Sequence, residues 1–192
     1  MGNLYNKPFP PKLLVDICGQ CCTDTYNEEI DIYQNVGYKG TKFLGRVWQT
    51  DPATGDSVDI YVRPADQELC AKVVIAFKGT REAEQSFYNA VAVGCALTSH
   101  AGSVSDAQSM FISTNLLNLV DSELRNSDTG MDYVDKPAKE VEWVFTGHSR
   151  GGVLAAAAHD FYYRSMKRRE LDPEGKETGT IVAQSLMVFA LD

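Results

Sequence analysis

The stretch of residues 143–158, WVFTGHSRGGVLAAAA, constrains the fold more than any other part of the chain. Its apolar start predicts a buried strand, and its alanine-rich end predicts a helix. Between them Ser149 is flanked by Gly147 and Gly151, the G-x-S-x-G pattern in which a serine stands on a sharp turn with its hydroxyl exposed. Glycines there allow strand and helix to approach closely. The pattern favours a nucleophile elbow over a glycine-rich turn without chemistry.

The rest of the chain alternates between helical and strand patterns. Apolar residues at three- and four-residue steps predict helices, which cover residues 12–26, 104–125 and the segment from the elbow to about Glu170. Short apolar or β-branched runs predict strands, which cover residues 42–50, 58–62, 71–77 and 180–190, besides the strand before Ser149. In the helix at 104–125, a four-residue repeat is expected to face the core, with two apolar residues beside it: Ile112, Leu116, Val120 and Leu124, then Phe111 and Leu117.

This order predicts an α/β fold with a mostly parallel central sheet flanked by helices. The strands at 42–50 and 58–62, with a turn-forming stretch between them, are expected to form an antiparallel hairpin at one edge. Residues 1–11 carry three prolines and predict an extended lead-in, and residues 12–192 predict a single domain. Residues 126–139 are expected to be a polar surface connection.

Charge and cysteine content narrow the classes of partner. A net charge of -8 argues against nucleic acid, whose binding needs clustered Lys and Arg. Five cysteines are an odd number and do not suggest a disulfide framework, and the cluster Cys18, Cys21 and Cys22 lacks a second Cys or His pair at zinc-site spacing. No metal or cofactor is expected.

Since no signal peptide or bilayer-spanning run is found, a cytoplasmic protein is expected.

A serine nucleophile needs a base, an acid to orient that base, and N–H donors for the oxyanion. The backbone N–H of Arg150 follows Ser149 at the predicted helix start, where the helix dipole reinforces a donor to an oxyanion. A second donor is expected from a loop at the carboxyl end of a neighbouring strand. The loop 77–80, FKGT, offers Thr80 with its backbone N–H and its hydroxyl.

Two motifs in this order, IAFKGTRE at 75–82 and VFTGHSRGGVLAA at 144–156, resemble the class 3 (fungal-type) lipase family of α/β-hydrolases. The resemblance covers residues 35–190. It implies an α/β-hydrolase-like fold and a hydrolase of carboxylic esters of the acylglycerol type, with Ser149 as nucleophile and Thr80 and Arg150 as oxyanion donors. It also implies a lid at 86–97 and, through it, peripheral contact with a lipid or membrane surface.

The sequence departs from the family pattern in three respects. Lys78 and Arg150 stand where the family more often has Arg and Leu, and Arg150 places a cation beside the site. In the family an Asp and then a His follow the nucleophile on loops after later strands. This sequence is expected to end before those strands, so the acid and the base are not found in it.

The histidines that are present offer one candidate base. His148 adjoins Ser149, but its side chain is expected to point away from the turn and to be structural. His159 lies about 15 Å along the predicted helix from Ser149, at about 1.5 Å per residue. His100, in the break before the helix at 104–125, is the only histidine whose loop could reach the site, although a solvated loop histidine is the simpler interpretation.

Three hypotheses follow. The chain is a lipase-like serine hydrolase completed by a further segment, or a binding or assembly module that keeps the elbow without catalysis, or an active variant with His100 as base. In addition, the apolar strand at 180–190 is expected to leave an unpaired sheet edge, along which the chain associates with itself or with a partner.

Overall fold

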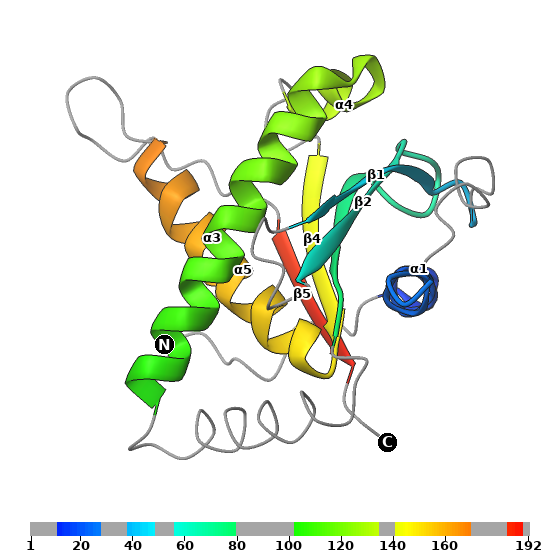
Figure 1. Cartoon of the computed structure of the whole chain (residues 1–192). Coiled ribbons are helices and arrows are strands. Elements are labelled where there is room, and N and C mark those ends of the chain that lie inside the picture. The colour runs from blue at the N-terminus through cyan, green and yellow to red at the C-terminus, as the bar shows by residue number, and fades with distance from the viewer. Residues whose placement is uncertain are drawn as a thin grey trace, which may run out of the picture.

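The structure, a computed structural model, describes residues 11–27, 38–48, 56–79, 102–134, 141–169 and 184–189 of the chain. These residues form a five-stranded sheet with helices on both faces (Figure 1). The strands run in the spatial order in which they occur in the sequence: β1 (Lys42–Trp48), β2 (Ser57–Arg63), β3 (Ala71–Phe77), β4 (Val141–His148) and β5 (Gln184–Phe189). The helices are α1 (Lys12–Asp24), α3 (Gly102–Asn126), α4 (Asp128–Val134) and α5 (Arg150–Arg169).

The sheet is mixed, because β1, β2 and β3 pair antiparallel whereas β3, β4 and β5 pair parallel. The α/β class and the antiparallel hairpin at one edge are confirmed. The prediction of a mostly parallel sheet is wrong, since two of the four pairings are antiparallel. The reason is the short connection 64–70 between β2 and β3, because a parallel pairing needs a crossover of about a dozen residues or more.

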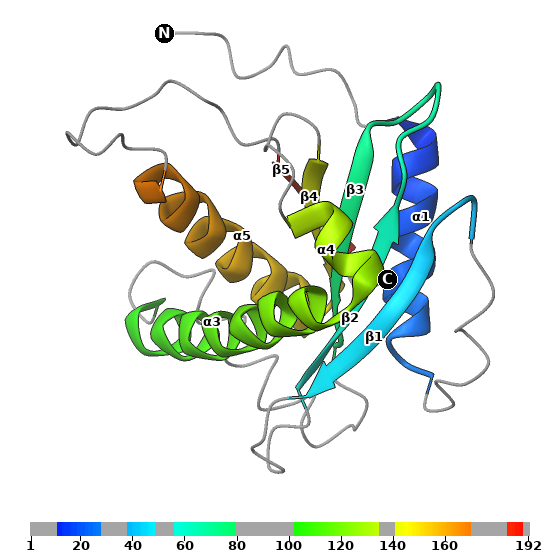
Figure 2. The ribbon, with the colours of Figure 1, turned by 90° about the horizontal axis from the view of Figure 1, so that it is seen from above.

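Two apolar layers lie on opposite faces of the sheet, with α1 on one face and α3 and α5 on the other (Figure 2). Alternate residues of β3 serve the two layers: Val73 and Ile75 face α3 and α5, whereas Val74 and Ala76 face α1. All seven residues of β3 are buried, as expected of a strand covered on both faces. The carboxyl ends of β3 and β4 therefore reach the edge of the sheet between two fixed layers.

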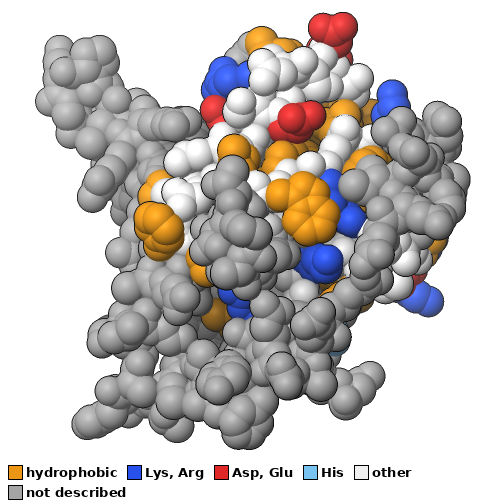
Figure 3. Space-filling model, viewed as in Figure 1, with side chains coloured by type: hydrophobic (Ala, Val, Ile, Leu, Met, Phe, Trp, Pro, Cys, Tyr) orange, Lys and Arg blue, Asp and Glu red, His pale blue; other side chains and the backbone are white. Residues whose placement is uncertain are grey.

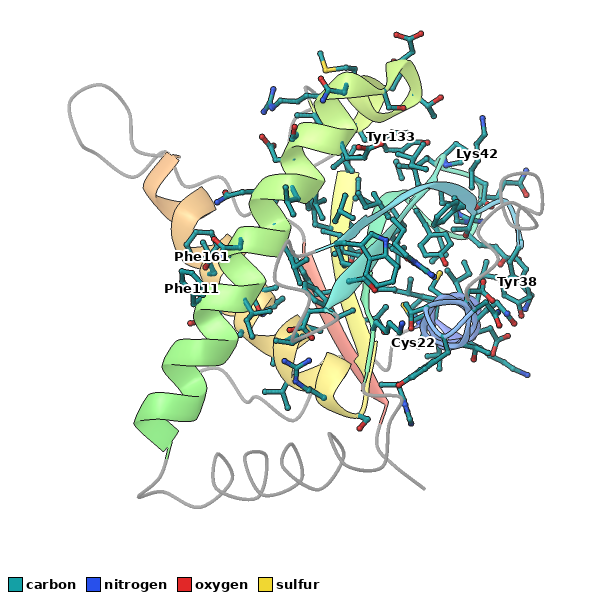
Figure 4. All side chains as sticks on the ribbon, in the orientation of Figure 1. Cys22, Tyr38, Lys42, Phe111, Tyr133 and Phe161 are labelled. Atoms are coloured by element: carbon teal, nitrogen blue, oxygen red, sulfur yellow. The ribbon has the colours of Figure 1, made fainter. Side chains whose placement is uncertain are left out.

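The helix predicted at 104–125 is confirmed as α3, and its four-residue repeat is buried. Leu117 is also buried, at 7% exposure, but Phe111 is 65% exposed. Figure 4 places Phe111 on the outer side of α3, near Phe161 of α5. Phe111 therefore does not share the buried face of α3 with Ile112, because one step along a helix turns the side chain by about 100°.

The polar connection predicted at 126–139 is wrong in part, because it contains the short helix α4. Gly130 explains how α4 folds back onto the end of α3. A Cβ at Gly130 would lie 2.4 Å from the carbonyl oxygen of Leu124. The Gly130 backbone N–H also donates to the hydroxyl of Ser127, at 3.3 Å. Of the lead-in predicted at 1–11, residues 1–10 lie outside the described residues.

The described part of the surface mixes side chains of both charges with apolar ones on the face shown in Figure 3. The large apolar side chains that are exposed belong to different elements: Trp48 of β1, Phe111 and Leu119 of α3, and Met131 of α4. Among the described helices, none combines the length and the apolar character that crossing a lipid bilayer requires.

Candidate active site

Ser149 turns the chain from strand to helix in a single residue. β4 ends at His148 and α5 begins at Arg150. The φ of Ser149 is 57°, in the left-handed region that residues with a Cβ rarely adopt. A serine held there costs about 1 kcal/mol or more and persists only where the surroundings enforce it. The predicted strand, sharp turn and helix are confirmed, and the backbone of Ser149 has the strained conformation expected of a nucleophile elbow.

Two glycines enforce this turn by close backbone contact. A Cβ at Gly147 would lie 2.2 Å from the carbonyl carbon and oxygen of Gly151. A Cβ at Gly151 would lie 2.2 Å from the carbonyl oxygen of Phe77, at the end of β3. Both clashes involve backbone atoms, so no side-chain rotation could relieve them. The G-x-S-x-G spacing is therefore required by the packing of β4 and α5 against the end of β3.

Arg150, the first residue of α5, is paired with a buried carboxylate. Its guanidinium donates to both oxygens of Asp56, and the Nη2–Oδ2 distance is 2.9 Å. The side chain of Asp56 is 2% exposed and that of Arg150 is 19% exposed. The cation predicted beside the site is thus present but is engaged by Asp56. The backbone N–H of Arg150 lies in the first turn of α5, where N–H groups have no partner within the helix.

Asp56 is a site residue that the sequence did not reveal. It precedes β2, and because β2 and β3 are antiparallel it lies at the same edge as the carboxyl end of β3. The pair joins residues 94 positions apart. The only signal in the sequence was Arg150 itself, since a cation close to a buried turn is often paired with a carboxylate. The sequence alone could not distinguish Asp56 from the other acidic residues.

His148 is held by Tyr26, the second site residue that the sequence missed. A hydrogen bond of 3.0 Å joins the Tyr26 hydroxyl to His148 Nδ1, and the two rings meet edge to face with centroids 5.9 Å apart. Burial raises the pKa of the Tyr26 hydroxyl, whereas the nearby Gly79 backbone N–H lowers it. The contact agrees with the structural role expected for His148.

Most of the other predicted site residues lie in segments that the structure does not describe. Thr80, His100 and the lid at 86–97 lie outside the described residues. His159 packs edge to face on Phe145, with ring centroids 5.8 Å apart, and it lies ten residues along α5 from Ser149. Within the described chain, the structure therefore brings Ser149 and Arg150 together with Asp56, His148 and Tyr26.

A second charged cluster fixes the end of α1 on the sheet. The Arg46 guanidinium donates to both carboxylate oxygens of Asp59, which is 1% exposed. It also donates to the carbonyl oxygens of Asn27, at 2.6 Å, and of Asp24, at 3.1 Å. The arrangement joins the carboxyl end of α1 to β1 and β2.

The three thiols of α1 are buried, and Cys18 and Cys21 belong to the apolar layer between α1 and the sheet. Burial raises the pKa of Cys18 to about 12 and that of Cys22 to about 11, and the pKa of Cys21 is raised as well. Buried thiols in apolar surroundings are inert. Within the described ranges, no group of three or more His, Cys, Asp or Glu side chains is arranged to hold a metal ion.

Comparisons of the chain with protein-family models, with curated proteins and with solved structures find no match. Any function must therefore be argued from the geometry around Ser149.

Proposed function

We propose that the protein is a serine hydrolase that cleaves carboxylic esters of the acylglycerol type through Ser149. The observation that carries the proposal is the left-handed backbone of Ser149, held between β4 and α5 by glycine contacts. A turn that strains a serine at the start of a helix is costly, and such strain is concentrated at functional sites. In an α/β-hydrolase arrangement this turn presents the serine Oγ above the edge of the sheet.

The start of α5 supports the second requirement, a site for the oxyanion. The N–H of Arg150 lies at the positive end of the helix dipole, which favours a developing negative charge. The pairing with Asp56 engages the guanidinium, so the backbone N–H is the group proposed to serve the oxyanion. Thr80, which follows the end of β3, is proposed as the second donor.

The proposed reaction is acyl transfer. Ser149 Oγ attacks the ester carbonyl carbon and its proton passes to a base, which then gives the proton to the departing alcohol oxygen. Water, activated by the same base, hydrolyses the acyl-enzyme and releases the acid. The base is proposed to come from outside the described residues, with His100 as the candidate in this chain. Tyr26 engages the Nδ1 atom of His148, and His159 is distant along α5.

Labelling by a fluorophosphonate probe tests the proposal. The wild-type protein should be labelled, and Ser149→Ala should not be. If His100 is the base, His100→Ala should lose most of the labelling, and added imidazole should restore part of it. Labelling that persists in Ser149→Ala would show that another residue reacts, and the proposal would fail.

One observation favours a different class of function, a lipase-like binding or assembly module without catalysis. Among the described residues, His148 is engaged by Tyr26 through Nδ1, and His159 packs on Phe145 ten residues along α5 from Ser149. A module of this kind would keep the elbow as a folding element. It would show no labelling at Ser149, with or without imidazole, while hydrolysis of a p-nitrophenyl ester that is lost in Ser149→Ala would exclude it.

Two partner surfaces belong to the same proposal. The lid at 86–97 would meet a lipid surface, and the edge of β5, the last strand in the described order, would pair with a second copy of the chain. Sedimentation at increasing concentration tests the second idea. A single monomer boundary at high concentration would contradict it.

A further inference from the structure

Tyr26 lies where the ends of two strands meet, just beyond the carboxyl end of α1. Its hydroxyl is hydrogen-bonded to His148 Nδ1, at the end of β4. The same oxygen also lies against Gly79, two residues beyond β3: a Cβ added at Gly79 would be 2.1 Å from Tyr26 Oη and 2.6 Å from the carbonyl oxygen of His148. One hydroxyl thus touches both loops that carry the proposed oxyanion donors.

The chain on both sides of Tyr26 is held by contacts with the sheet. One turn earlier, Cys22 Sγ lies 3.2 Å from Thr146 Oγ1, and this contact is buried between α1 and β4. Figure 4 shows Cys22 on the side of α1 that faces the sheet. The carbonyl oxygens of Asp24 and Asn27, on either side of Tyr26, accept hydrogen bonds from Arg46. Since the chain is held before and after Tyr26, the phenol ring has little freedom to follow a loop that moves.

The spacing between the two loops matters for an oxyanion site. Donors must lie about 2.7–3.1 Å from the position of the oxyanion, and a misplacement of about 1 Å can cost on the order of a hundredfold in rate. The backbone of Gly79 leads directly to Thr80, and that of His148 leads directly to Ser149 and Arg150. A group that bridges Gly79 and His148 therefore sets the separation of the two donors.

We propose that Tyr26 is a positioning residue that holds the loop at Gly79 and the elbow at His148 in the register needed for the oxyanion donors. This inference rests on the proposed function for its catalytic consequence. It also predicts that the glycine at 79 is required, because any side chain there would displace the Tyr26 hydroxyl. Tyr26 would act through the two loops, without itself contacting the substrate.

The test is Tyr26→Phe, which removes the hydroxyl and keeps the ring. Tyr133→Phe is the matched control: Tyr26 is half-buried and Tyr133 is buried, but Tyr133 lies on α4, away from the start of α5 (Figure 4). Two readouts are needed: ester hydrolysis, with kcat and KM separated, and amide hydrogen exchange of the segments containing Gly79 and Arg150.

In Tyr26→Phe we expect kcat to fall on the order of tenfold or more with KM little changed, since only the alignment of the donors is altered. Exchange at both segments should rise in Tyr26→Phe and stay at the wild-type level in Tyr133→Phe. His148→Ala should give a similar loss of kcat, and the double variant Tyr26→Phe/His148→Ala should be little worse than either single variant.

Unchanged exchange in Tyr26→Phe would overturn the inference whether or not the protein is active. Raised exchange with unchanged kcat would reduce Tyr26 to a structural contact and would also overturn it. A wild-type protein that is neither labelled by the fluorophosphonate nor active on esters would instead overturn the proposed function, and hydrogen exchange would still decide whether Tyr26 positions the loops.

Discussion

The ion pair between Asp56 and Arg150 gives the sharpest test of how the elbow is held. Removing one partner of a buried pair leaves an uncompensated charge, which costs about 3–5 kcal/mol. The two ends differ in burial, at 2% exposure for Asp56 and 19% for Arg150. Arg150→Met should therefore cost more, about 4 kcal/mol, because it leaves the carboxylate in the drier place, whereas Asp56→Asn should cost about 2–3 kcal/mol.

Urea unfolding at neutral pH of the two single variants and the double variant measures this prediction. The double variant should be more stable than the sum of the two losses implies, with a coupling energy on the order of 2 kcal/mol or more. The exposed pair Asp121 and Arg125 is the control: its Oδ2–Nε distance is 2.9 Å, but both side chains are 47% exposed. Asp121→Asn should change stability by less than about 0.5 kcal/mol. Single losses below about 1 kcal/mol that simply add would refute the argument.

Three further predictions concern the surroundings of the elbow. Gly151→Ala should destabilise the fold by about 3 kcal/mol in the same assay, because its Cβ would meet the backbone of β3; a loss below about 1 kcal/mol would show that the turn can open. Burial raises the pKa of Asp24 above its usual value of 3.8, so the folded state binds that proton more tightly and loses stability as pH rises through the folded pKa. Asp24→Asn should therefore gain stability relative to wild type as pH rises above about 4, and a difference that stays constant with pH would contradict this. An alkylating reagent should modify the exposed Cys70 in the native protein and should reach Cys18 and Cys22 only after unfolding, as peptide mapping would show.

Much of the fold could be predicted from the sequence because the informative elements are local. β3 is a run of apolar residues buried on both faces, and α3 repeats its buried residues every four positions, so composition and period were sufficient. The elbow was recognisable because Gly147 and Gly151 are required by contacts within a few residues or with one neighbouring strand.

The parts that the sequence did not predict depend on long-range partners or short connections. The hydrogen bond between Tyr26 and His148 spans 122 residues, and nothing in the sequence of a helix end indicates which loop it will contact. The antiparallel pairing of β2 with β3 follows from a short connection. Asp66 stabilises the turn in it, because its carboxylate accepts hydrogen bonds from the backbone N–H groups of Glu68 and Leu69. The helix α4 was missed because seven residues carry too little periodicity to predict a helix.

These findings change what Arg150 and His148 mean for the site. From the sequence, Arg150 was a cation beside the acyl site and His148 was expected to be structural, but neither had a known partner. In the structure Asp56 engages Arg150 and Tyr26 engages His148, and these partners come from different elements: Asp56 directly precedes β2, and Tyr26 follows α1. The residues on either side of Ser149 are therefore anchored independently. Such anchoring stabilises a strained turn whether or not catalysis occurs, so the decisive measurement is the reactivity of Ser149 itself.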